Sequence, residues 1–232
     1  MKHIFFILCI VTPCIHIILG KGHAVMKTSL TLDPSTTMEV ADAGSRVIPL
    51  GFDIILHGSI INTGERQLTI ESPATTQKIM VHLKSEQDTT ETTFLLNPSH
   101  MDALGEITIP PRTDLVIKPH KETQFTISLY SHVMDKCFIP GVFTAALSYD
   151  TVRSEPLLFT VKFTKNSVGR LLTILNDPKN DLWIRKESYR LLKKVKPDFV
   201  YNFNENSVES FNYWWDKEKD SRQVDSLIDT FE

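Results

Sequence analysis

The amino-acid sequence predicts a mainly β protein, in which an antiparallel β-sandwich is followed by a small C-terminal α-helical domain. Two observations predict this division. Hydrophobic residues alternate with a period of two before residue 165, whereas beyond it they recur with the spacing of an α-helix. Residues 25–164 also hold six Gly and nine Pro, against one Gly and two Pro in residues 165–232, which contain all three Trp. We therefore expect a domain boundary near Lys165-Asn166.

The chain begins with residues 1–24, which predict a secretory signal peptide. A short positive start precedes an apolar run of 16 residues, Ile4 to Leu19. This run is shorter than the roughly 20 residues of a membrane span. Small residues allow cleavage after Gly20 or after Ala24. An uncleaved anchor is the alternative, and it is the only membrane contact that we expect.

Composition and charge limit the compartment and the partners. The chain has 232 residues, 41% of them hydrophobic and 23% charged, which is ordinary for a globular protein. Its formal net charge of −3 argues against nucleic acid as the main partner. Cleavage after Ala24 would leave Cys137 as the single cysteine, so no internal disulfide is expected. The absence of an Asn-x-Ser/Thr acceptor beyond residue 24 favours a bacterial periplasm or exterior.

The β region contains nine runs in which apolar residues occupy every second position. Such spacing places apolar side chains on one face of a strand. Asn62-Thr63-Gly64 and several Pro residues mark the turns between the runs. The candidate strands are carried by Phe52/Ile54/Leu56/Ile60, Leu68/Ile70, Ile79/Val81/Leu83, Phe94/Leu96, Ile107/Ile109, Leu115/Ile117, Phe125/Ile127/Leu129, Phe143/Ala145/Leu147/Tyr149 and Phe159/Val161/Phe163.

Turn motifs in this region resemble those of bacterial immunoglobulin-like domains. Residues 117–127 resemble their proline, polar turn and alternating strand, and residues 139–143 resemble their Pro-Gly-aromatic strand entry. Residues 154–161 resemble a closing strand, and residues 60–65 resemble a hairpin of this family. The resemblance covers most of residues 45–163. It implies an immunoglobulin-like β-sandwich and says nothing about function.

The C-terminal region predicts four short helical segments. The break at residues 176–181 offers an Asn or Asp N-cap for the second helix, which ends before Pro197. Asn206 or Ser207 is expected to cap the third, with Glu209 completing a capping box. The apolar faces are Val168/Leu171/Leu172/Leu175, Ile184/Ser188/Leu191/Leu192/Val195, Val208/Phe211/Trp215 and Val224/Leu227/Ile228/Phe231, with an extended connector at Phe199/Tyr201/Phe203.

Residues 171–192 resemble one HEAT-like helical repeat. Trp183-Ile184-Arg185 stands where that family begins its second helix, and Phe199-Val200-Tyr201-Asn202 with Trp214-Trp215 resembles the element after the last repeat. Only one unit is present, and a repeat helix pair does not bury its own apolar face. The third helix is the nearest cover, followed by the sandwich, and any face left bare would be a docking surface.

Charge in the helical region is segregated along the chain. Residues 185–196 carry a net charge of +5, and residues 198–232 carry −6. The basic helix either pairs internally with the acidic third helix or binds an acidic partner or lipid surface. We expect Trp215 to point inward and Trp214 to lie at the rim, because adjacent helix residues cannot both face the core. The candidate partner-binding residues are Trp214, Arg185, Arg190, Lys193 and Lys194.

The sequence contains no catalytic motif. It lacks His-Glu-x-x-His, Gly-x-Ser-x-Gly, P-loop and Cys-x-x-Cys patterns, and its histidines show no metal-ligand spacing. Cys137 is expected to be a buried hydrophobe. We therefore expect no catalytic residue, no metal and no cofactor. The favoured function is a secreted, non-enzymatic protein-interaction or structural module whose partner is another protein. The alternatives are a hydrolase or metal-dependent enzyme with a loop-built site, and a carbohydrate-binding sandwich, which the lack of Trp in the sandwich weakens.

Overall fold

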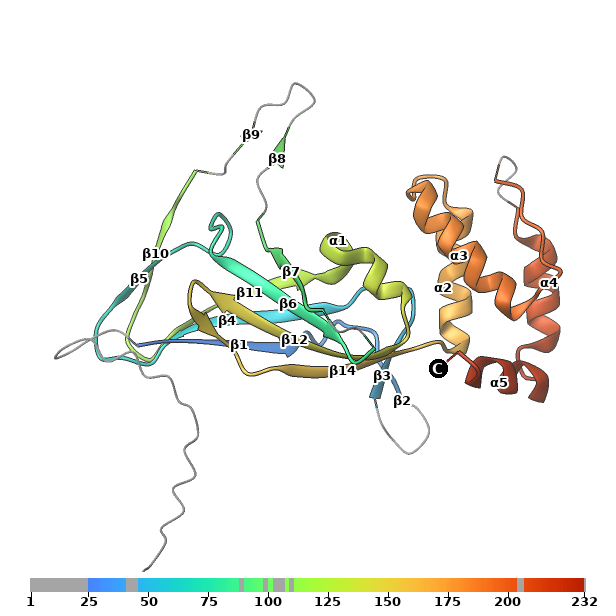
Figure 1. Ribbon diagram of the computed structural model, residues 1–232, viewed down its shortest axis with the longest axis horizontal. Helices are drawn as coiled ribbons and strands as arrows, with labels where there is room; N and C mark the ends of the chain where they lie inside the picture. Colours follow the sequence, from blue (N-terminus) through green and yellow to red (C-terminus); the bar gives the residue numbers. More distant parts are fainter. Residues whose placement is uncertain are drawn as a thin grey trace, which may run out of the picture.

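The protein consists of layered β-sheets, which we call the sandwich, with a group of helices at one end (Figure 1). The computed structural model describes residues 25–40, 46–87, 90–97, 100–101, 107–108, 111–203 and 207–231. The signal peptide expected at residues 1–24 lies outside the described residues. Strand and helix are nearly equal, at about 34% and 30%, so the fold is a mixture rather than mainly β.

Strands dominate the chain up to residue 162. They are β1 (Met26–Leu32), β2 (Glu39–Val40), β3 (Arg46–Pro49), β4 (Ile55–Asn62), β5 (Leu68–Glu71), β6 (Ile79–Ser85), β7 (Thr92–Leu95), β8 (His100–Met101), β9 (Ile107–Thr108), β10 (Asp114–Ile117), β11 (Glu122–Ser128), β12 (Gly141–Tyr149), β13 (Val152–Arg153) and β14 (Leu157–Lys162). The runs expected from the period-two pattern all fall on or beside strands. The strands before residue 50 were not expected.

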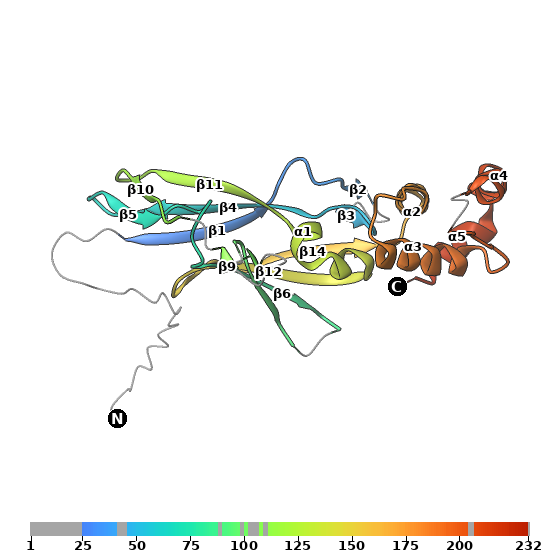
Figure 2. The same ribbon diagram turned by 90° about the horizontal axis from the view of Figure 1, so that it is seen from above.

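The strands form two layers, which Figure 2 shows edge-on. One layer has the order β1-β4-β11, and the other has the order β2-β3-β14-β12-β6-β7, with β13 paired to β12. The strands β5 and β10 form a separate two-stranded ribbon, as do β8 and β9. The pairing is antiparallel except between β14 and β3, where Val161 pairs with Ile48 in parallel. The expectation of a purely antiparallel sandwich is therefore wrong at this point.

The core between the layers follows the expected alternation. Leu56 and Ile60 of β4 are fully buried, as are Val81 of β6 and Leu147 of β12. Gly58 lies between the two β4 residues, and a Cβ there would come within 2.6 Å of the Phe125 ring. A glycine is thus required where this ring crosses the strand.

A short helical insertion separates β11 from β12. It comprises α1 (Leu129–Val133) and the 3₁₀ helix η2 (Met134–Phe138). Leu129 was expected to end a strand, but Ser128 caps α1 by accepting a hydrogen bond from the Ser131 amide at 3.1 Å. Cys137 in η2 is fully buried, and its burial raises the pKa of the thiol to about 12. Cys137 therefore is the small buried hydrophobe that the sequence predicts.

Beyond β14 the described elements are helices: α2 (Lys165–Asn176), α3 (Leu182–Val195), α4 (Glu209–Glu218) and α5 (Arg222–Asp229). Thr164 forms a capping box with Ser167 at the start of α2, and Asp181 caps α3 as expected. The expected cap of the third helix at Ser207 is wrong. Val208 is the N-cap residue of α4 and makes no side-chain cap bond. Asn206 lies outside the described residues.

The apolar faces of α2 and α3 are covered by the chain itself. Val168, Leu171 and Leu175 on α2 and Leu192 on α3 are fully buried in a core that is continuous with that of the sandwich. Packing reaches across the boundary, because the rings of Phe163 and Phe231 stack with their centroids 4.0 Å apart. No bare helix face remains at the expected place.

Helix α2 packs against the turn after β3. Gly51 adopts a φ of +87°, and a Cβ on it would lie 3.4 Å from Leu171 Cδ2. The Arg170 Nε donates a hydrogen bond to the Gly51 carbonyl at 3.2 Å. Helix α2 is therefore fixed against the end of the sandwich.

Candidate functional site

Arg185 is buried within the chain, whereas the sequence predicted it to be on an exposed partner-binding surface. Only 7% of the residue is exposed. Its Nε donates to the Leu175 carbonyl at 2.9 Å, and its NH2 donates to the Tyr201 hydroxyl at 3.2 Å. The guanidinium lies over the Phe203 ring at 5.4 Å. Arg185 thus joins the end of α2 to the connector after α3. Its burial follows the helical phase, because Ser188 and Leu192, three and seven residues later, lie on the same buried side of α3.

The other basic residues of α3 are exposed on its outer side. Arg190 pairs with Glu187 on the same helix, with Nε 2.9 Å from Oε2. Lys193 and Lys194 lie over aromatic rings, at 5.8 Å from Tyr189 and 5.6 Å from Phe231. Within the described ranges, no ion pair joins these basic residues to an acid of α4 or α5. Lys196 and Lys194 do lie near the third helix and the end of the chain, over the rings of Trp214 and Phe231, but among the described residues this proximity includes no ion pair between α3 and α4.

The two adjacent tryptophans of α4 are both half-buried. Trp214 packs edge-on against the fully buried Phe211, with centroids 5.4 Å apart, and Lys196 Nζ lies 5.5 Å from its ring. Trp215 is not the inward anchor that the sequence predicts, because Phe211 occupies that position. Its ring instead lines a hollow described below.

Sequence reasoning missed the most exposed tryptophan of the chain's described part. Trp183, near the start of α3, is 50% exposed, and its ring edge contacts Phe138 of the sandwich. It lies one turn before Lys186 and two turns before Arg190 on the same side of the helix. The helical spacing could have revealed this grouping. We call Trp183, Lys186, Arg190, Lys193 and Lys194 the α3 outer face.

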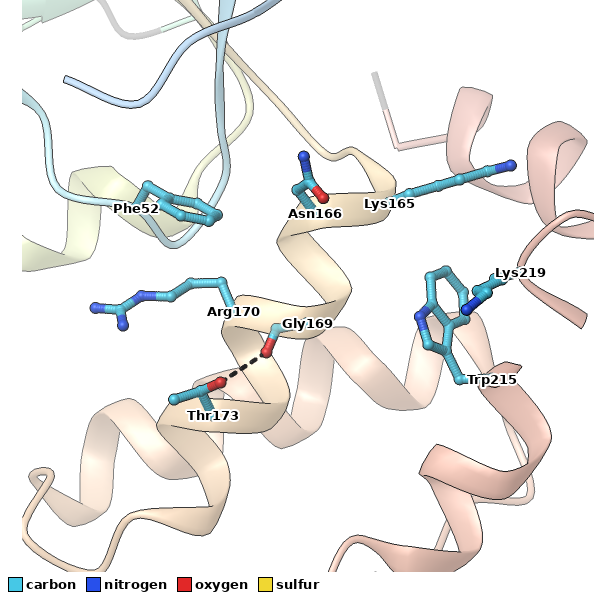
Figure 3. Close-up of a pocket in the computed structure, with 8 residues that line it drawn as sticks. All are labelled: Phe52, Lys165, Asn166, Gly169, Arg170, Thr173, Trp215 and Lys219. Carbon is cyan, nitrogen blue, oxygen red and sulfur yellow. Dashed lines mark hydrogen bonds between the residues drawn. The ribbon is translucent and has the colours of Figure 1, made fainter. Parts of the chain in front are cut away.

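A hollow of about 540 Å³ lies between the turn after β3, helix α2 and helix α4 (Figure 3). Helix α2 contributes one stripe of its surface, and α4 and its C-cap residue contribute Trp215 and Lys219, one turn apart. Among the residues that the structure describes, no acidic one lines this hollow. Its lining residues are Phe52, Lys165, Asn166, Gly169, Arg170, Thr173, Trp215 and Lys219.

Acids at the rim of the hollow pair with two of its cations. Lys165 Nζ lies 2.8 Å from Asp225 Oδ1 and 3.6 Å from Asp220 Oδ1. Hydrogen bonding to Asp225 raises the pKa of Lys165. Lys219 Nζ lies 3.4 Å from Asp216 Oδ1. These pairs are exposed to water, so each holds its lysine only weakly.

A serine, a histidine and a glutamate form a hydrogen-bonded series on the outer face of the second sheet. His82 Nε2 lies 2.9 Å from Ser148 Oγ, and His82 Nδ1 lies 2.9 Å from Glu91 Oε1. This order of groups is that of a nucleophile, a base and an orienting acid. Ser148, however, is only 4% exposed, and its strand pairs with neighbours on both sides. The ladder thus uses the amides that an oxyanion hole would need.

His120 and His132, which the sequence left free to meet through loops, do not lie near each other. His120 and His132 lie at opposite ends of β11. His120 is 3.3 Å from Glu65, while His132 contacts the carbonyls of Ser128 and Leu96 at 2.8 and 3.1 Å. The side chain of His100 lies outside the described residues. In the part of the chain that is described, no three His, Cys, Asp or Glu side chains meet to form a possible metal site.

A search for membrane-crossing helices among the described residues found none of sufficient length and apolar character.

Comparisons with known proteins identify no family. No family model and no curated protein matches the chain. Solved structures with partial likeness include the β-glucosidase EmGH1 of Erythrobacter marinus, at 10% identity and a TM-score of 0.34 over 60% of this chain and 15% of that one. The β-glucosidase of Listeria innocua in complex with glucose gives 13% identity and 0.32 over 62% and 17%.

A third solved structure is the alkylpurine DNA glycosylase AlkC of Pseudomonas fluorescens bound to DNA containing an abasic site analogue. It gives 12% identity and a TM-score of 0.34 over 60% of this chain and 30% of that one. The chain therefore spans less than a third of the length of each of these proteins. At such TM-scores the likeness supports no inference about fold or function.

Proposed function

We propose that this chain is a secreted, non-enzymatic protein-interaction or structural module. In this proposal, residues 1–24 are a signal peptide for export to a bacterial periplasm or exterior. Residues 25–164 are an immunoglobulin-like sandwich, and residues 165–232 are a HEAT-like helical domain that binds an acidic protein. The two-layer arrangement of strands supports the sandwich assignment, and the packed helix pair α2–α3 supports the repeat-like assignment.

The α3 outer face is the observation that carries the proposal. Lys186, Lys193 and Lys194 are exposed, and none of them has an ion-pair partner among the described residues. Trp183 adds a large, half-exposed aromatic surface to the same side of the helix. Aromatic anchors beside cationic side chains are typical of protein interfaces, where the ring supplies affinity and the charges supply steering.

The charges around this face favour a protein over a membrane or a nucleic acid. Residues 198–232, which follow the basic helix, carry a net charge of −6. A wide anionic surface, such as a membrane or a DNA duplex, would meet these acids as it approached the lysines, whereas a narrow acidic chain would not. A protein surface can present acidic groups to α3 and avoid the acids of α4 and α5.

A charge-reversal experiment tests the proposal. The triple variant Lys186→Glu/Lys193→Glu/Lys194→Glu is compared with a matched variant of exposed sandwich residues, Lys84→Glu/Lys118→Glu/Lys121→Glu. The probe is immobilised poly-L-glutamate, and binding is measured as a function of salt concentration. We expect the α3 variant to lose at least about tenfold in affinity, because each steering charge contributes up to about 1 kcal/mol.

The outcomes separate the possible partners. Equal loss in both triple variants would mean that the chain binds acidic polymers through its general charge, which contradicts the proposal. A parallel measurement uses vesicles of phosphatidylglycerol. Binding to vesicles but not to poly-L-glutamate would replace the protein partner by a lipid surface.

The Ser148–His82–Glu91 series favours a second candidate, a serine hydrolase. The hydrogen-bond distances of 2.9 Å support it, whereas the burial of Ser148 opposes it. The test is labelling with a fluorophosphonate probe, which modifies activated serines. Labelling that disappears in Ser148→Ala would establish the hydrolase. We expect no labelling, because the serine hydroxyl is covered and the strand that carries it is paired on both sides.

A further inference from the structure

Gly169 stands in the middle of α2 without a reason in the packing of the fold. A Cβ at this position would meet no heavy atom within 4 Å. Glycine within a helix is less favourable than alanine, because its backbone has more freedom to lose on folding. The missing side chain leaves the α2 backbone open at the centre of the stripe that lines the hollow of Figure 3. A ligand that approaches this backbone closely would account for the glycine.

Aromatic rings stand on either side of Gly169. Figure 3 shows Phe52 on one side of α2 and Trp215 on the other. Both are half-buried, so each ring keeps surface that a ligand can cover. Asn166 and Thr173 lie above and below the glycine along the same stripe. Asn166 offers an amide group, whereas the Thr173 hydroxyl donates a hydrogen bond to the Gly169 carbonyl at 3.0 Å and offers a ligand only its acceptor lone pairs. The hollow therefore combines ring surfaces with hydrogen-bonding groups.

All the charged groups that line the hollow are cations. Arg170 is oriented by its hydrogen bond to the Gly51 carbonyl, and its guanidinium fork has four further N–H donors. Lys165 and Lys219 pair with aspartates whose side chains are at least half exposed to water. A carboxylate entering the hollow can replace these aspartates at little cost, because exposed ion pairs are weak.

We infer that this hollow binds an acidic saccharide of one or two rings. The ring face of the sugar packs on Trp215 above Gly169, the carboxylate is met by Lys165 and Lys219, and the hydroxyls bond to Asn166 and Thr173. A volume of about 540 Å³ suits a ligand of this size. The inference does not depend on the α3 outer face, which lies on another helix.

Calorimetric titration of the whole chain with D-glucuronic acid tests the inference. Three further ligands separate its parts: glucose has the ring without the charge, sulfate has the charge without the ring, and benzoate has a flat ring with a carboxylate but no hydroxyls. We expect glucuronic acid to bind at least about tenfold more tightly than each of the three. Equal binding of any of them, or no binding of glucuronic acid at millimolar concentration, would overturn the acidic saccharide.

Gly169→Ala is the decisive variant, since it separates binding from folding. The added methyl group has room and favours the helix, so the melting temperature should rise. The same methyl group occupies the floor of the hollow, so glucuronic acid should bind at least about fivefold more weakly. Unchanged affinity in this variant would contradict the inference.

A second pair of variants tests the charges at the rim. Asp225→Asn removes the nearer of the two aspartates that pair with Lys165 and should tighten glucuronic acid binding about two- to threefold, whereas Asp229→Asn on the same helix should leave it unchanged. Weaker binding in Asp225→Asn would show that the carboxylate does not meet Lys165. That result would overturn the inferred orientation.

Discussion

The contacts that stabilise the sandwich differ in kind from those that stabilise the group of helices. In the sandwich, backbone ladders join the strands, and single polar residues such as the fully buried Asn62 tie the turns to them. Among the helices, the cover of α2 and α3 comes from a cluster of aromatic side chains on the connector and on α4. Phe199 and Phe211 are fully buried at its centre, with ring centroids 4.8 Å apart. The helical part thus depends on a compact cluster of aromatic rings, whereas the sandwich combines a core of mostly aliphatic side chains with backbone ladders and single polar ties.

The largest effect should follow from breaking the aromatic cluster. Phe211→Ala removes a fully buried ring that contacts Phe199, Trp214 and Trp215. We expect a loss of about 3–5 kcal/mol in the free energy of unfolding. Urea unfolding followed by tryptophan fluorescence measures it. The control is Tyr213→Ala on the exposed side of the same helix, and a similar loss in both would contradict the cluster's central role.

Arg185 provides the next test, because it distinguishes a structural from a binding role. Arg185→Ala leaves the Leu175 carbonyl and the Tyr201 hydroxyl without this donor in a buried place. The expected cost is about 2–3 kcal/mol in the free energy of unfolding. Arg190→Ala, which removes an exposed cation of the same helix, should cost less than about 0.5 kcal/mol. Thermal and urea unfolding of the two variants check the contrast, and equal costs would restore Arg185 as a surface residue.

A smaller loss is expected from one of the polar ties in the sandwich. The Tyr149 hydroxyl accepts a hydrogen bond from the Glu71 amide at 3.0 Å and thereby joins β12 to the β5–β10 ribbon. Tyr149→Phe keeps the ring and removes this bond, so the free energy of unfolding should fall by about 1 kcal/mol. Amide hydrogen exchange should accelerate in β5 but not in β4. Uniform acceleration in both strands would show that the tie is not local.

The smallest expected effect concerns the pH dependence of the sandwich. The hydrogen bond from Arg153 lowers the pKa of Glu91 from its ordinary value of 4.5. A lowered pKa in the folded state means that the unfolded state binds the proton more readily. Stability from this pair is therefore complete above about pH 4.5 and is lost as the pH falls through the lowered value.

Urea midpoints at pH 6 and at pH 3.5 measure this dependence. Glu91→Gln should reduce the difference between the two midpoints, whereas Glu122→Gln on the exposed side of β11 should not. An unchanged pH dependence in Glu91→Gln would mean that the pair with Arg153 contributes nothing.

Alternating apolar residues were sufficient to predict most strands, and helical spacing predicted α2 and α3. The strand β1 escaped because its inward positions include Thr28, a polar residue that is 1% exposed, so the apolar alternation is interrupted. The insertion α1–η2 escaped because its first turn is stabilised by Asp53, whose Oδ1 accepts from the Tyr130 amide at 3.0 Å. Such a long-range contact leaves no periodic trace in the sequence.

The candidate sites were less predictable than the fold. The sequence correctly predicted that the four basic candidate residues lie on one helix. It did not predict which of them are buried, because only the helical phase distinguishes buried Arg185 from exposed Arg190. Phe52 and Trp215 both line the hollow although they are far apart in the chain. They come together only because α2 packs against the turn after β3. No local pattern encodes that juxtaposition.

The short passage from β14 to α2 has a mechanical consequence. Only Phe163 and Thr164 separate the strand from the helix; the first is buried, and the second caps the helix. The helices therefore cannot swivel about a hinge at this point. The start of β1 and the helices lie at opposite ends of the long axis of the molecule (Figure 2). Whatever is attached to one end would be held by a stiff rod at a constant spacing from whatever α3 touches at the other.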